Sequence, residues 1–277
     1  MDTLDRRRFG EGIAALAALV AVGAFDARAA QQVKADHDMS NMPASWTGNE
    51  KIGFLIHPQF TALDMVGPHF MLTGLMGATA FVIAKDKAPV VSDTGLTITP
   101  DASFDDAPLD LDILCVPGGA SGTLAAMQDE ATLRFIKSRG ARAKYVTSVC
   151  TGSLLLGAAG LLDGYKATSH WSTKPLLPIF GATPSPGRFV RDRNRITAEG
   201  VTAGLDFALA LVGELRDRTY AEGVQLIAQY APEPPFDAGQ PERAPAAVRT
   251  MMEEMFVGFR SSADQIGRDA FARSKAL

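Results

Sequence analysis

Short, almost wholly apolar runs alternate along this chain with segments of helical periodicity, and this alternation restricts the fold more than any other feature. The runs lie at 52–56, 81–84, 113–116 and 145–149. A strand buried on both faces of a parallel sheet is apolar throughout, whereas a strand with one solvated face alternates. Strands that alternate with helices form βαβ units, whose helices cover both faces of the sheet. The sequence therefore predicts an α/β sandwich with a mostly parallel sheet.

Helical periodicity fills most of the chain between these runs. We expect helices at 61–76, 130–142, 152–159, 203–215 and 246–256. Two pairs of short runs, 90–92 with 96–98 and 189–191 with 195–197, have the spacing of antiparallel strands. The expected fold is a flavodoxin-like sandwich in a single domain over residues 51–256, preceded by a polar linker at 31–50 and followed by a C-terminal extension at 257–277.

The first thirty residues have the pattern of an export signal. Arg6-Arg7-Arg8-Phe9 precedes an uncharged stretch at 12–25, and Ala27-Arg28-Ala29 follows as a small-x-small cleavage site. Paired arginines before x-Phe favour the twin-arginine route, although Asp5 stands where that motif usually has Ser or Thr. The stretch is shorter than the roughly 20 residues of a membrane span. We expect a periplasmic protein without stable membrane insertion after processing; an uncleaved N-terminal anchor is the alternative.

Composition limits the possible partners. Hydrophobic residues make up 47% and charged residues 21% of the chain, which are ordinary globular values. There are 27 Lys and Arg against 31 Asp and Glu, giving a net charge of −4. No basic run occurs beyond the first ten residues, so a nucleic-acid partner is not expected. A small-molecule substrate is the remaining expectation.

The segment Ser148-Val149-Cys150-Thr151-Gly152 carries the sharpest chemical signal. It joins an expected buried strand to a helix of small residues, and such a tight turn exposes a nucleophile at the carboxyl end of the sheet. The helix N-terminus favours the thiolate of Cys150. The alternative for Cys150 is a buried structural thiol, which is our interpretation of Cys115. We expect no disulfide between them.

A second turn, Pro117-Gly118-Gly119, follows the run at 113–116. Glycines leave backbone N–H groups open, so Gly118 and Gly119 are candidate oxyanion donors, although a Gly-Gly pair alone is also ordinary turn chemistry. No GxGxxG or P-loop motif follows any expected strand. His37 in the linker is a lone histidine. We therefore expect neither a cofactor nor a metal.

These motifs together resemble the ThiJ/PfpI branch of the class I glutamine-amidotransferase-like superfamily, and within that branch the isonitrile hydratases. The similarity covers residues 51 to about 255. The segments that carry it are IGFLIHPQFTALDMVGPHF (52–70), DILCVPGG (112–119), SVCTGSLLLGAAGLLDG (148–164), KATSHW (166–171), ITAEGVTAGLDFAL (196–209) and AQYAPEPPFDAGQPERAP (228–245).

The resemblance implies a role for individual residues. Cys150 takes the place of the nucleophile, Thr151 follows it, and Asp64 takes the place of the acid early in the first helix. His170 matches a histidine found near the cysteine in related branches. Those branches place His directly after the nucleophile, whereas this chain has Thr151, which puts peptidase activity in doubt and fits the hydratases. The resemblance further implies no cofactor and a homodimer.

Isonitrile chemistry needs the same groups. A thiolate adds to the electrophilic isonitrile carbon, an acid protonates that carbon, and water converts the thioimidate to an N-substituted formamide. Cys150 and Asp64 match the first two requirements, and the like charge of a thiolate is expected to raise the pKa of Asp64. Asp64 as a surface helix cap and His170 as a structural neighbour of Trp171 are the alternatives.

Two other functions remain open from the sequence. A reactive cysteine of this kind also suits a stress or redox protein that acts on carbonyls. Related domains also form the sensor part of AraC-type regulators, which need a C-terminal helix-turn-helix pair of about a hundred residues. Residues 232–277 are too few and too mixed in charge for such a pair.

Overall fold

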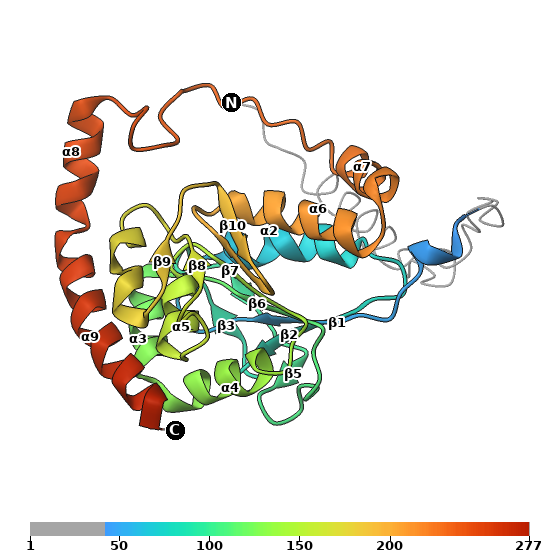
Figure 1. Cartoon of the computed structure of the whole chain (residues 1–277), viewed down its shortest axis with the longest axis horizontal. Helices are drawn as coiled ribbons and strands as arrows, with labels where there is room; N and C mark the ends of the chain where they lie inside the picture. The colour runs from blue at the N-terminus through green and yellow to red at the C-terminus, as the bar shows by residue number, and fades with distance from the viewer. Residues whose placement is uncertain (1–41, 277) are drawn as a thin grey trace, which may run out of the picture. The chain divides into compact units, whose positions relative to one another are not determined.

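The computed structural model describes residues 42–276, and a seven-stranded sheet forms its centre (Figure 1). In spatial order the strands are β10 (Phe189–Asp192), β11 (Arg195–Ala198), β7 (Tyr145–Val149), β6 (Ile113–Val116), β1 (Lys51–Leu55), β2 (Thr79–Ala84) and β5 (Ala102–Ser103). All neighbours pair in parallel except β10 and β11, which are antiparallel. The flavodoxin-like α/β sandwich with a mostly parallel sheet is confirmed.

The four apolar runs form the strands β1, β2, β6 and β7. Every residue of β6 is buried, and β1 exposes only Lys51, as expected for strands covered on both faces. Ile52 of β1 lies opposite Ile113 of β6, which in turn lies opposite Tyr145 of β7. This register brings the carboxyl ends of the three strands to one edge of the sheet.

Helices cover the two faces of the sheet, and an apolar core cluster lies on each face. One face carries α2 (Ala62–Thr73), α6 (Ala203–Leu215) and α7 (Arg218–Ile227), with core residues such as Met71, Phe207 and Val224. The other face carries α3 (Ala120–Gln128), α4 (Glu130–Gly140), α5 (Gly152–Ala158) and α9 (Val257–Ala276), with core residues such as Ile136, Leu155 and Phe271.

The structure contains elements that the sequence analysis did not anticipate. Helices α3, α7 and α9, the 3₁₀ segment Lys174–Phe180, strand β5 and the pair β8 (Lys166–Ala167) and β9 (Thr183–Pro184) are additional. The two expected antiparallel pairs are present as β3 (Val90–Val91) with β4 (Thr97–Ile98) and as β10 with β11. The helix expected at 246–256 is α8 (Ala246–Met255).

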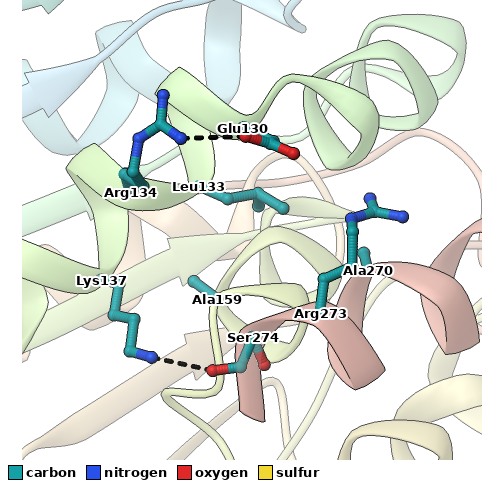
Figure 2. Close-up of a pocket in the computed structure, with 8 residues that line it drawn as sticks. All are labelled: Glu130, Leu133, Arg134, Lys137, Ala159, Ala270, Arg273 and Ser274. Atoms are coloured by element: carbon teal, nitrogen blue, oxygen red, sulfur yellow. Dashed lines mark hydrogen bonds and ion pairs between the residues drawn. The ribbon is translucent and has the colours of Figure 1, made fainter. Parts of the chain in front are cut away.

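The segment interpreted as a C-terminal extension forms helix α9 through Ala276. Ala263, Ala270 and Phe271 of α9 are buried in the core cluster beside α3, α4 and α5. Lys137 Nζ donates to the Ser274 carbonyl at 2.8 Å, which joins α4 to the last turn of α9. Figure 2 shows this junction, where a cavity of about 210 Å³ lies between the two helices over Ala159.

The predicted export signal (1–30) and residues 31–41 of the linker lie outside the described residues. Among the helices that the structure does describe, none combines the length and the apolar character needed to cross a membrane.

Candidate active site

The proposed reactive groups lie where three adjacent strands end. Cys150 directly follows β7, Gly118 is the second residue after β6, and β1 leads through a short loop into α2, which carries Asp64. Because β7, β6 and β1 are neighbours in the sheet, segments up to 86 residues apart, from Asp64 to Cys150, meet at one edge. This is the edge at which open α/β sheets place their sites.

Cys150 occupies a strained turn. Its φ is +59°, in the left-handed region that non-glycine residues seldom adopt. The Cys150 N–H donates to the Ala198 carbonyl at 3.0 Å. The Cys150 carbonyl accepts from Ser153 Oγ at 3.2 Å and from Ser169 Oγ at 3.3 Å. Contacts from three different segments therefore hold the nucleophile in a conformation that the local chain disfavours.

Asp64 is a buried acid and not a surface cap. Its side chain lies in the first turn of α2, and the residue is only 2% exposed. Oδ2 accepts from the Gly118 N–H at 2.9 Å, while Oδ1 has no nitrogen or oxygen donor among residues 42–276. Burial raises the pKa of Asp64 to about 7, against the lowering effect of the Gly118 N–H. The raised pKa agrees with expectation, but its main cause is burial and not a like charge.

Gly118 is the spacer between the acid and the nucleophile segment. A Cβ at this position would lie 2.5 Å from Thr151 Oγ1, 2.6 Å from Thr151 N and 3.0 Å from Asp64 Oδ2. No side chain fits in that space. Glycine is thus required here by close approach. Gly118 lies between the Asp64 carboxyl and the turn at 148–152 that carries Cys150, which we call the elbow.

The two glycine N–H groups have acceptors within the protein, which differs from the open oxyanion hole expected from the sequence. Gly118 N–H donates to Asp64, and Gly119 N–H donates to Thr151 Oγ1 at 3.1 Å. In this structure the Gly-Gly turn orients the two side chains that flank Cys150. The N–H groups of Gly118 and Gly119, which the sequence predicted to be free, instead hold the side chains of Asp64 and Thr151 in place.

The pKa of Cys150 is raised overall, although the backbone N–H at the start of α5 acts in the expected direction, toward the thiolate. Burial, followed by the negative charge of Asp64, raises the pKa of Cys150 well above its ordinary value, whereas the backbone N–H and the hydroxyl of Thr151 lower it. Asp64 thus disfavours ionisation of Cys150, whereas a hydrogen bond from the Cys150 thiol lowers the pKa of Asp64. Cys150 and Asp64 therefore titrate together, and a thiolate forms at lowest cost when Asp64 holds the proton.

His170 lies beside the elbow, but its described contact with Cys150 is through the main chain. The His170 N–H donates to the Cys150 carbonyl at 3.4 Å. Its Nδ1 lies 2.7 Å from Ser172 Oγ, and its ring packs against Trp171 and Phe256. Burial lowers the pKa of His170, so the imidazole is neutral at pH 7. The structure places Phe256, from the junction of α8 and α9, next to this segment.

Cys115 is separate from the reactive pair. It lies within β6, opposite Phe54 of β1 and Thr147 of β7, and burial raises the pKa of its thiol to about 12. Both cysteines are free thiols. Within residues 42–276, no three His, Cys, Asp or Glu side chains converge in the manner of a metal site.

Two features of this edge were not identified from the sequence. Thr123 of α3 is fully buried, and its Oγ1 lies 2.8 Å from Thr151 Oγ1. The residue gave no sequence signal, because α3 itself was not anticipated. A cavity of about 590 Å³ also opens between the loop after β1 and α3; its lining includes His57, Gln59, Phe104 and Gly122 but neither Cys150 nor Asp64.

Comparisons with known proteins agree with this geometry. The DJ-1/PfpI family profile matches residues 50–214. The isonitrile hydratase of Pseudomonas putida is 53% identical over 198 residues, which are 72% of this chain and 86% of that protein. The crystal structure of a ThiJ/PfpI family protein from Pseudomonas syringae superposes with a TM-score of 0.81 at 55% identity, covering 84% of this chain and 98% of that one.

More distant relatives share parts of the chain. The HTH-type transcriptional regulator GbdR of Pseudomonas aeruginosa is 34% identical over 185 residues, which are 63% of this chain but only 49% of the regulator. The family profile and the superposition cover most of the described residues. The site combines an elbow cysteine, a buried acid after the first strand and a Gly-Gly turn. We conclude that the chain belongs to the DJ-1/PfpI family.

Proposed function

We propose that this protein hydrates isonitriles to N-substituted formamides. The observation that carries the proposal is the buried Asp64, whose pKa near 7 lets it hold a proton beside the Cys150 thiol at neutral pH. An acid of this kind is needed to protonate a carbon atom after thiolate attack. The similarity to an isonitrile hydratase supports the same substrate class.

The first half of the reaction forms a carbon–sulfur bond. With the shared proton on Asp64, the Cys150 thiolate attacks the terminal carbon of R–N≡C. Asp64 delivers its proton to that carbon as the negative charge develops there. The products are a thioimidate, R–N=CH–S–Cys150, and an ionised Asp64. The Thr151 N–H and hydroxyl, which stabilise negative charge on sulfur, favour the attacking form of Cys150.

The second half breaks the same bond. Water adds across the C=N bond, its hydroxyl joining the carbon and its other hydrogen ending on nitrogen. The Asp64 carboxylate then takes the proton of the new hydroxyl as the carbon–sulfur bond breaks. This releases R–NH–CHO and restores both the thiolate and the protonated acid. One water is consumed, and no other co-reactant is needed.

The test is turnover of cyclohexyl isocyanide by the purified protein, with N-cyclohexylformamide measured as product. Cys150→Ala should abolish turnover, and Asp64→Asn should lower it by about 10²–10⁴-fold, the usual contribution of general acid–base catalysis. Cys115→Ala is the matched thiol control and should remain active. Formamide production by folded Cys150→Ala would overturn the covalent route. Activity on a 2-oxoaldehyde with none on the isonitrile would favour the carbonyl-directed stress function.

We also propose a homodimer. Leu63, Val66 and Phe70 form an exposed apolar stripe on α2, the helix that carries Asp64, and such a stripe suits a self-complementary interface. Light scattering should report two chains per particle for the unaltered protein and one for Phe70→Glu. Leu109→Glu, at an exposed apolar residue outside α2, should leave the particle dimeric. A monomeric unaltered protein would contradict the proposal.

We propose, finally, export to the periplasm through the twin-arginine route. Support comes from the arginines at 6–8, the apolar stretch at 12–25 and the Ala27-Arg28-Ala29 site. Mass spectrometry of the periplasmic protein should find an N-terminus at Ala30 or Gln31. An intact Met1 in the cytoplasmic fraction would refute processing, and Arg6→Lys with Arg7→Lys should retain the precursor inside the cell.

A further inference from the structure

We infer that Thr123 is a positioning residue, whose hydroxyl turns the proton of the Thr151 hydroxyl toward the sulfur of Cys150. The inference deepens the proposed function, because it concerns how the nucleophile of that reaction is prepared. It depends on two hydrogen-bonding groups, the Gly119 N–H and the Thr123 hydroxyl, which meet at one oxygen atom, Thr151 Oγ1.

The meeting point is buried and its distances are short. Thr151 Oγ1 lies 3.1 Å from the Gly119 nitrogen and 2.8 Å from Thr123 Oγ1. Thr123 is fully buried and Thr151 almost so. Thr123 is held in turn by its own N–H, which donates to the Gly119 carbonyl at 3.1 Å. Residue 119 and residue 123 thus approach the same oxygen from one end of α3.

The direction of these bonds follows from the donors available. A backbone N–H can only donate, so Gly119 occupies one lone pair of Thr151 Oγ1. Among the described residues, Thr151 Oγ1 is the one hydrogen-bond partner of Thr123 Oγ1. If Thr151 donated to Thr123, the Thr123 proton would be buried with no acceptor there. If Thr123 donates to Thr151, both lone pairs of Thr151 are used and its own proton is left for another acceptor.

The acceptor in this inference is the sulfur of the adjacent residue, because the Thr151 side chain forms a hydrogen bond with Cys150. The Thr151 hydroxyl interacts with Cys150 in the sense that favours the thiolate. A hydrogen bond that is donated to a charged group is stronger than one between neutral groups. Thr123 therefore acts on the nucleophile indirectly. It orients the Thr151 hydroxyl, which lowers the pKa of Cys150 and so opposes the effects of burial and of Asp64. Replacing its hydroxyl by a methyl would free Thr151 to turn away.

The test compares Thr123→Val, which keeps the shape and removes the hydroxyl, with Thr123→Ser, which keeps the hydroxyl. The readout is the rate at which iodoacetamide alkylates Cys150, followed by peptide mass spectrometry across pH. Thr123→Val should lower the rate at pH 7 by about tenfold and move the profile to higher pH by about one unit, since one unit corresponds to a factor of ten. Thr123→Ser should restore the rate to within about twofold.

A matched control removes a different buried hydroxyl. Thr147 is fully buried in β7, and its Oγ1 donates to the Leu114 carbonyl at 3.2 Å, away from Thr151. Folded Thr147→Val should keep the alkylation profile unchanged. If Thr123→Val does not fold, Thr123→Ala takes its place, with the same expected shift. A profile that does not move in the folded variant, or one that Thr123→Ser fails to restore, overturns the inference.

Turnover provides a second readout. Thr123→Val should lower kcat for the isonitrile with KM changed by less than about twofold, because Thr123 acts on the nucleophile and not on substrate binding. Alkylation does not need an isonitrile, so the two proposals fail separately. Shifted alkylation in a protein without hydratase activity would leave this inference standing and remove the proposed function.

Discussion

At the scale of single residues, the proton shared by Cys150 and Asp64 decides when the site is competent. The reactive form of the pair holds one proton, with Asp64 protonated and Cys150 ionised. Because the pKa of Asp64 is about 7 and that of Cys150 is raised well above its ordinary value, the pair holds two protons below about pH 7 and one proton above it. We expect kcat/KM for the isonitrile to rise with pH up to about 7 and then to level off, since kcat/KM reports ionisation of the free enzyme. The low residual activity of Asp64→Asn should lack this inflection near pH 7. An inflection that persists in Asp64→Asn would assign it to another group.

Gly118 offers a second prediction at this scale. Gly118→Ala inserts a methyl group 2.5 Å from Thr151 Oγ1 and 3.0 Å from Asp64 Oδ2, so the turn must move. Turnover should fall by at least 10²-fold, since displacements of about 1 Å at a reactive site cost that much. Gly223→Ala, in α7 with no atom within 4 Å of the added Cβ, is the control and should match the parent. Comparable turnover in both variants would show that the spacer is dispensable.

At the scale of elements, helix α9 joins the core although it lies beyond the expected domain boundary. Phe271 packs edge-on against Phe180 at a centroid distance of 6.0 Å. Phe271→Ala should lower the free energy of unfolding by about 3 kcal/mol, as is usual for a buried phenylalanine. Phe236→Ala, at a position 80% exposed, should change it by less than about 0.5 kcal/mol. Urea denaturation measures both, and equal effects would mean that α9 is not part of the cooperative unit.

The elements differ in how readily they could be predicted. The central strands and α6 were evident, because long apolar or strongly periodic segments carry their signal locally. Helix α3 was not, because its sequence, ASGTLAAMQ, is made of small residues with no clear apolar stripe. Helix α7 did have a signal: Asp217 caps its first turn by accepting from the Tyr220 N–H at 2.8 Å, and Tyr220 and Val224 lie one turn apart on its buried face.

The same contrast applies to the site. The elbow and the Gly-Gly turn each consist of consecutive residues, so both could be identified from the sequence. The assignment of Gly118 N–H to Asp64, and of Gly119 N–H and Thr123 to Thr151, depends on pairs 54, 32 and 28 residues apart. Such bonds are set by strand order and helix placement. Their pattern therefore became visible only with the fold.

At the scale of the whole molecule, the buried acid links stability to pH. The pKa of Asp64 is raised from 3.8 to about 7, so the folded state holds a proton that the unfolded chain has released between these values. Its stabilising effect is complete below about pH 4 and is lost as pH rises through about 7. Between pH 4.5 and 7, the free energy of unfolding should fall by about 3 kcal/mol more in the parent than in Asp64→Asn. Denaturation of both proteins at the two pH values measures this, and parallel curves would contradict it.

The position of the reactive segments in the sheet bears on how such a protein diverges. The strands β7, β6 and β1 each have a paired strand on both sides, whereas β10 and β5 form the two borders. Insertions at those borders leave β7, β6 and β1, and with them the strand ends that lead to Cys150, Gly118 and Asp64, paired on both sides. Substrate specificity can therefore change during evolution while the reaction stays the same. Libraries of variants with substitutions only at the borders of the sheet should contain a high fraction of active members.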